Sequence, residues 1–309
     1  MKSILFILLL CVLVPLTSCN KEEAPCEDST STVDQNKTTR KVLIIGIDGF
    51  RADALTPTSA PFLSSFSQDP FTYFTRQNQV EYHTLSGPNW TTLLTGVHWE
   101  KHLVVDNFFS FYDETNYPPF FYYIENAQAS INTVSICHWL PINSRVVKEY
   151  ADYSPLNLIN DSAVYADGLA IIDQTSNIAG DVIFLAFDDL DHNGHLYGFH
   201  DTIPEYRQAV TTMSFYTEGL VNAVETRRSL GEDWMIFIVS DHGGEGRGHT
   251  GMPDVPSVRQ TIFFANHPSA SFRSNYISSQ TDLAPTILSF LGIQIAAFDC
   301  KKDGVSLID

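Results

Sequence analysis

The chain has 309 residues, of which 44% are apolar, 12% aromatic and 17% charged. A chain of this length and composition forms one large globular domain or two small ones, and either can bury a hydrophobic core. The formal net charge of -18 argues against a nucleic-acid-binding surface, because phosphate backbones are bound by clustered Lys and Arg and the sequence has no such cluster.

The first residues have the pattern of an export signal. Lys2 precedes an apolar stretch at 4–14 that is too short to span a bilayer, and small residues then lead to Cys19. This pattern resembles a bacterial lipoprotein signal peptide at 1–18. The resemblance implies acylation of Cys19, so that a lipid anchor holds the protein in the bacterial cell envelope, facing the periplasm or the cell surface. An ordinary secretory signal is the alternative.

Residues 19–40 are rich in polar side chains and lack apolar periodicity, so we expect a flexible tether there. The folded domain is then expected to span 41–309, and no internal linker divides it. A disulfide between Cys26 and Cys300 is conceivable in an oxidising compartment.

Apolar runs of strand length alternate with longer helical patterns from Lys41 onward. Strands are expected at 42–47, 133–136, 182–187, 235–239 and 261–264, where β-branched and aromatic residues dominate. Helices are expected at 61–68, 89–94, 119–127, 161–174, 204–229 and 282–291. Continuous apolar strands between helices predict an α/β fold with a mostly parallel central sheet and helices on both faces.

Polar side chains follow three of the predicted strands. They are Asp48 after the strand at 42–47, Asp191 and His195 after 182–187, and Asp241 and His242 after 235–239. Taken singly, each residue also suits a turn, a solvated loop or a helix cap. Because sites in such sheets gather at the carboxyl ends of the strands, we expect these side chains to meet. Mixed oxygen and nitrogen ligands suit zinc, with manganese or iron less favoured, and the histidines disfavour calcium and magnesium.

Ser86 is the candidate nucleophile. It lies just before a helix that opens with Pro88, where the positive end of the helix dipole stabilises an alkoxide and a phosphoryl oxygen. The alternative is a serine that only caps the helix.

These motifs together resemble a known family. Five motifs occur in the order found in the alkaline phosphatase superfamily, with the closest resemblance to its type I phosphodiesterase/nucleotide pyrophosphatase branch. The motifs are Asp48-Gly49, the Ser86-Gly-Pro-Asn run with Thr95-Gly96 and Asp106-Asn107, Asp191-His-Asn-Gly-His195, Ser240-Asp-His-Gly243, and the tail at 281–307. The resemblance covers about 41–309.

The resemblance implies two metal sites, each holding one divalent ion, with Zn expected and Mn or Fe less favoured. One set of ligands would be Asp48, Ser86, Asp241 and His242, and the other Asp191, His195 and His249, with His267 as the alternative to His249. Asn107 matches a position that in the family hydrogen-bonds a phosphoryl oxygen.

The implied function is that of a phosphodiesterase/nucleotide pyrophosphatase, a hydrolase of small phosphoesters that acts through a phospho-serine. A phosphomonoesterase or phosphonate hydrolase of the same superfamily is the alternative, and a non-catalytic binding lipoprotein is a third possibility. The branch usually has a threonine nucleophile, whereas the aligned residue here is Ser86, with Thr84 as the fallback. A sulfatase is disfavoured, because its Cys/Ser-x-Pro-x-Arg motif would need arginine where this chain has Trp90.

Two aromatic stretches follow Asn107. Residues 108–112 are the better candidates for ligand contact, through stacking on a base or packing against an aryl or lipid group. Residues 120–123 are expected to form the core face of a helix instead.

Overall fold

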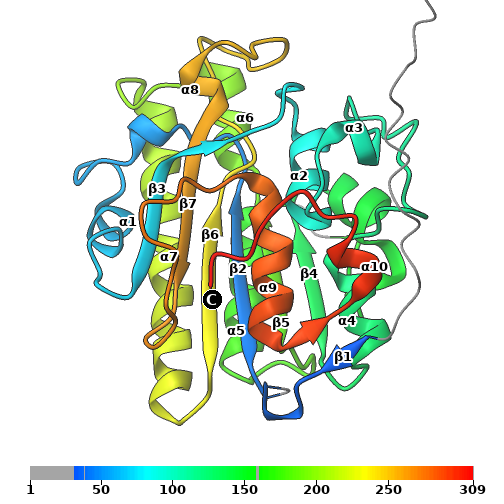
Figure 1. Ribbon diagram of the computed structural model, residues 1–309. Coiled ribbons are helices and arrows are strands. Elements are labelled where there is room, and N and C mark those ends of the chain that lie inside the picture. The colour runs from blue at the N-terminus through cyan, green and yellow to red at the C-terminus, as the bar shows by residue number, and fades with distance from the viewer. Residues whose placement is uncertain (1–30, 38, 158–159, 309) are drawn as a thin grey trace, which may run out of the picture.

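The computed structural model describes residues 31–37, 39–157 and 160–308. A six-stranded sheet with the order β3-β7-β6-β2-β5-β4 forms its centre (Figure 1). The strands are β2 (Lys41–Ile47), β3 (Thr72–Gln79), β4 (Thr133–Cys137), β5 (Val182–Phe187), β6 (Trp234–Val239) and β7 (Gln260–Asn266). β4, β5, β2 and β6 are parallel, and β7 is antiparallel to both of its neighbours. The predicted α/β class and the mostly parallel sheet are confirmed.

Helices cover both faces of this sheet. They are α1 (Pro61–Phe66), α2 (Ser86–Thr95), α3 (Trp99–His102), α4 (Phe120–Ala127), α5 (Asp161–Ile172), α6 (Asp189–Tyr197), α7 (Pro204–Ser229), α8 (Pro256–Arg259), α9 (Leu283–Leu291) and α10 (Ala296–Asp299). Short 3-10 turns occur at Gln35–Lys37, Ala52–Ala54, Lys148–Tyr150 and Gln280–Asp282, and Ile142–Val147 forms a π-helical turn. No helix within the described residues is both long and apolar enough to cross a membrane.

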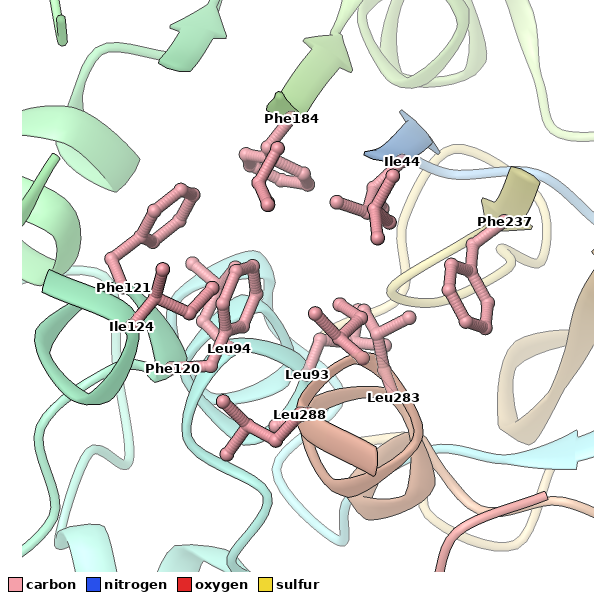
Figure 2. Packing of buried hydrophobic residues seen from close by; sticks show 14 of the residues in the cluster. Ile44, Leu93, Leu94, Phe120, Phe121, Ile124, Phe184, Phe237, Leu283 and Leu288 are labelled. Atoms are coloured by element: carbon pink, nitrogen blue, oxygen red, sulfur yellow. The ribbon is translucent and has the colours of Figure 1, made fainter. Parts of the chain in front are cut away.

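The alternation of side chains along the strands builds two cores. On β2, Val42 and Ile44 point to one face, while Leu43, Ile45 and Ile47 point to the other. The first face packs against α2, α4 and α9, and Figure 2 shows their side chains around Ile44. The second packs against α1, α5, α6 and α7. Because both faces are covered, the central strands β2, β5 and β6 are almost entirely apolar, and this pattern is what predicts them from the sequence.

The structure differs from the predicted elements in two places that matter. β3 was not expected, since its sequence is polar and half-exposed as befits an edge strand. No helix was predicted around Asp191, but the stretch forms helix α6, which begins at Asp189 directly after β5.

Part of the expected tether is in contact with the domain. β1 (Thr32–Val33) pairs antiparallel with β8 (Ile293–Gln294), near the end of the sheet where β2 begins (Figure 1). The signal peptide, Cys19 and Cys26 lie outside the described residues, and the boundary at residue 41 stays a prediction.

Gly46 offers a test of the packing behind the site. A Cβ at this position of β2 would lie 2.6 Å from the ring of Trp90, which rests on the strand. We expect Gly46→Ala to lower the free energy of unfolding by about 1–3 kcal/mol through overpacking. Denaturant-induced unfolding measures this. Gly248→Ala is the matched control, since its added Cβ would meet nothing within 4 Å. Equal stability of the two variants would contradict the packing argument.

Candidate active site and metal centre

The carboxyl ends of β2 and β6 place two carboxylates side by side. Asp48 directly follows β2 and Asp241 lies two residues after β6, and both are almost completely buried. Asp48 Oδ2 accepts a hydrogen bond from Trp90 Nε1 at 3.0 Å. Asp241 Oδ1 accepts from the backbone N–H groups of Gly49 and His242. Each of the two carboxylates therefore accepts hydrogen bonds through only one of its two oxygens.

His242 connects these carboxylates to the candidate nucleophile. Its Nε2 lies 3.2 Å from Ser86 Oγ, 3.3 Å from Asp241 Oδ2 and 3.5 Å from Asp48 Oδ1. The four residues that the family resemblance implies for one metal site are thus brought together. Ser86 is the first residue of α2, so the observed helix starts three residues before the predicted one.

Asp191, His195 and His249 form a second group beside the first. His195 Nε2 lies 3.2 Å from Asp191 Oδ2 and 3.0 Å from His249 Nε2, and His249 Nε2 lies 3.8 Å from Asp191 Oδ1. The imidazoles of His242 and His249 stack with centroids 3.7 Å apart, so the two groups adjoin. Asp191 is also within 4.8 Å of the ligand atoms of Asp48 and His242.

His267, the alternative to His249, is not part of this arrangement. It is paired with Asp233, at 2.6 Å between His267 Nε2 and Asp233 Oδ1. Of the two histidines, His249 is the one that the structure brings to Asp191.

The orientation of the three imidazoles is fixed by backbone carbonyls. The Nδ1 atoms of His242, His249 and His195 lie 2.9, 2.6 and 3.0 Å from the carbonyl oxygens of Gly243, Thr84 and Arg247 respectively. Each Nδ1 therefore donates a proton outward, and each Nε2 faces the carboxylates. This is the arrangement in which histidine binds a metal through Nε2.

Three carboxylate oxygens at this edge have no hydrogen-bond partner. They are Asp48 Oδ1, Asp191 Oδ1 and Asp241 Oδ2, and all are buried. Burial and the charges of Asp241 and Asp191 hold the pKa of Asp48 well above its usual range, and burial and Asp191 do the same to the pKa of Asp241. Burial also lowers the pKa of both His242 and His249 to about 3, so these imidazoles are neutral. Neutral imidazoles beside crowded carboxylates, each with one unpartnered oxygen, form a set of ligands that fits divalent cations.

The side chain of Asn107 contacts the first turn of α2. Its Oδ1 accepts from the Gly87 backbone N–H at 2.8 Å, so its amide NH₂ group is left to donate. A Cβ on Gly87 would lie 2.6 Å from the Asp106 carbonyl oxygen, and only glycine permits this close approach. Asn107 thus sits beside Ser86, as the resemblance implies.

The hydroxyl of Thr84, the alternative nucleophile, is used in a hydrogen bond to the backbone. Thr84 is buried, and its hydroxyl donates to the backbone carbonyl of His249. The hydroxyl that faces the histidine and carboxylate groups is that of Ser86.

Two supporting residues were missed in the sequence. Trp90 holds Asp48 by its indole N–H, and its place one helical turn after Ser86 was the available signal. Arg51 is 5% exposed, and its guanidinium binds Asp53, Glu245 and the carbonyls of Phe199 and Gly244. Nothing in the sequence indicated that Arg51 is buried.

The aromatic stretches differ as expected. Phe108, which directly follows Asn107, is 79% exposed, and Phe111 is 73% exposed. Phe109 is buried against Trp139 with φ of 60°, and this left-handed turn accompanies the outward position of its neighbours. Residues 120–123 form the first half of α4, with three of the four side chains buried in the core.

Solved structures share this architecture. A murine ectonucleotide pyrophosphatase/phosphodiesterase 5 (ENPP5), an inactive variant in complex with AMP, matches with a TM-score of 0.64 and 17% identity over 83% of this chain and 96% of that one. A 2-O GAG sulfatase matches with a TM-score of 0.63 and 14% identity over 87% of this chain and 73% of that one. The fold is that of the alkaline phosphatase superfamily.

The sequence comparisons give the family. The profile of the family described as type I phosphodiesterase / nucleotide pyrophosphatase matches residues 42–151 and 138–247. More than half of the chain is matched, so the chain belongs to this family. Bis(5'-adenosyl)-triphosphatase ENPP4 from Bos taurus is 24% identical over 223 residues, or 66% of this chain. The chain spans only 47% of the length of that relative.

The crowding of carboxylates predicts how the chain responds to Asp48→Asn. Asparagine keeps the acceptor for Trp90 but removes a buried charge next to Asp241. With chelator present, we expect a higher Tm than wild type, by about 2–4 °C for each kcal/mol of repulsion relieved. With zinc, we expect a smaller rise in Tm than wild type shows. Differential scanning calorimetry measures both. Asp299→Asn, at the surface of α10, should change neither, and a lower Tm of Asp48→Asn in chelator would contradict the repulsion.

Proposed function

We propose that the chain is a metal-dependent hydrolase of phosphoric esters, a phosphodiesterase/nucleotide pyrophosphatase with Ser86 as nucleophile. The observation that carries the proposal is the position of Ser86 Oγ at the start of α2, 3.2 Å from His242 Nε2, which also lies near the unpartnered oxygens of Asp48 and Asp241. Family membership supports the same class of reaction.

Two divalent cations would be held by the side chains described above. Asp48, Ser86, Asp241 and His242 would hold one, and Asp191, His195 and His249 the other. When bound, the two ions lower the pKa of the serine hydroxyl and offset negative charge on the transferred phosphoryl group. Zinc is the proposed metal, because the donors are carboxylates and imidazoles.

The chain's own residues then carry out the transfer. Ser86 Oγ attacks phosphorus, the bond to the leaving oxygen breaks, and a phospho-serine forms. The free NH₂ group of Asn107 and the positive end of α2 stabilise the equatorial oxygens. With a diester substrate, the phospho-serine keeps the second ester group, so attack by water on its phosphorus releases a phosphate monoester and restores the Ser86 hydroxyl.

The existing contacts of the Arg51 guanidinium favour a phosphate diester over a monoester as the substrate. A monoester carries an additional negative charge that a cationic side chain would offset. The guanidinium of Arg51 is already bound by Asp53, Glu245 and two carbonyls, and it supports the backbone. Arg51, the arginine closest to Asp48 in sequence, is therefore not available to a second charge.

Nucleotides are the proposed substrate class. The bovine relative is named for bis(5'-adenosyl) triphosphate, and the murine structure contains AMP. Phe108 and Phe111, two exposed residues of the segment that follows Asn107, offer faces on which a base can stack. We further propose that acylated Cys19 anchors the protein in the bacterial cell envelope. This rests on the sequence pattern of residues 1–19.

Ser86→Ala tests the nucleophile. We expect kcat/KM to fall about 10³-fold or more, and no covalent phosphate on the protein by mass spectrometry, because no other hydroxyl takes its position. Thr84→Val should still become phosphorylated on Ser86. Activity of Ser86→Ala equal to wild type would refute the assignment.

Substrate preference tests the subclass. With zinc, we expect faster hydrolysis of bis-p-nitrophenyl phosphate and bis(5'-adenosyl) triphosphate than of p-nitrophenyl phosphate, and no hydrolysis of p-nitrophenyl sulfate. A preference for the monoester would point to the phosphomonoesterase alternative. Binding without turnover of any of these would favour a binding lipoprotein.

Asn107→Asp separates the two roles of the Asn107 side chain. The carboxylate keeps an acceptor for the Gly87 N–H but removes the NH₂ donor. We expect kcat to fall about 10²–10³-fold, as for the loss of one oxyanion donor, with the same number of bound ions. Steady-state kinetics and metal analysis measure this. An unchanged kcat would show that Asn107 does not contact the phosphoryl group.

A further inference from the structure

The ring of Phe199 packs against the imidazoles of His195 and His249. The ring of Phe199 is 1% exposed. It meets His195 edge to face, with centroids 5.3 Å apart and planes at 85°, and it meets His249 in the same way at 6.0 Å and 82°. The ring therefore limits the orientation of both imidazoles.

Two glycines make room for this ring, Gly194 within the Asp191–His195 motif and Gly244 directly after the Ser240–Gly243 motif. A Cβ on Gly194 would lie 2.3 Å from the Phe199 ring, and a Cβ on Gly244 would lie 2.2 Å from it. Neither glycine has a positive φ, so backbone conformation does not require them. The requirement comes from the ring, which fills the space where both Cβ atoms would be.

The backbone of Phe199 is fixed from outside. Its N–H donates to the Gly246 carbonyl at 2.7 Å, and its carbonyl accepts from Arg51 Nη1 at 2.7 Å. The same guanidinium that donates to the Phe199 carbonyl also donates to the Gly244 carbonyl at 3.1 Å. Arg51 thus joins the two segments that enclose the ring.

We propose that Phe199 is a positioning residue for the second metal site, and that Gly194 and Gly244 are glycine in order to admit its ring. The inference rests on the two-metal site proposed above. His195 has a side chain 43% exposed and would otherwise lose side-chain freedom when a cation binds. A ring that already restricts it lowers this loss, as supporting contacts do in other metal sites.

Phe199→Leu tests the proposal by metal binding rather than by activity. Zinc titration of the full chain by calorimetry, with metal analysis after dialysis, gives the number of ions and the affinity of each. We expect one ion to bind as in wild type and the other about 10–100-fold more weakly. Phe264→Leu is the matched control, since Phe264 is a fully buried phenylalanine in the same core on β7, and both of its ions should bind as in wild type.

Variants at Gly194 test whether this residue must be glycine in order to admit the ring of Phe199. Gly194→Ala should weaken the same single ion in the wild-type background. In the Phe199→Ala background, Gly194→Ala should cause no further loss, because the ring that it would displace is gone. Independent, additive losses in the two backgrounds would overturn this explanation of the glycine.

The outcomes separate the two proposals. If wild type binds two ions and Phe199→Leu binds both unchanged, or if Phe199→Leu and Phe264→Leu weaken both ions to the same extent, the role of Phe199 is refuted and the two-metal site stands. If wild type binds fewer than two ions, the two-metal site fails, and this inference fails with it.

Discussion

Three unpartnered carboxylate oxygens at one edge of a buried sheet are the constraint on which the rest of the site depends. Asp48, Asp191 and Asp241 reach this edge because parallel strands end together there, and burial removes the water that would solvate them. Such a cluster is unfavourable without cations. The neutral histidines beside it supply the further ligands that make cation binding specific.

Much of the surrounding structure keeps these side chains in place. Trp90 holds one oxygen of Asp48 and leaves the other free. Thr84 and His249 bond to each other's backbone carbonyls, which ties the segment before Ser86 to the second group of ligands. Stability and site geometry thus depend on the same contacts, so a change in supporting residues is expected to affect metal binding as well as the fold.

The sequence predicted the parts that follow from local pattern. Apolar strands ending in Asp48 or Asp241 identify both the sheet and its functional edge, because burial on both faces removes polar residues from the strands. β3 was not predicted, because an edge strand tolerates polar side chains and therefore lacks the apolar pattern of the central strands. The roles of Trp90 and Phe199 were not predicted, because they depend on contacts with Asp48 and His249, which are distant from them in sequence. The resemblance indicated His249, but its distance from Asp191 required the structure.

X-ray diffraction from zinc-soaked crystals, with data collected on both sides of the zinc absorption edge, tests the central claim most directly. The account predicts two anomalous peaks about 3.5–4 Å apart, one against Asp48, Asp241, His242 and Ser86 and the other against Asp191, His195 and His249. A single peak shared by all three carboxylates, or no peak at this edge of the sheet, would contradict it.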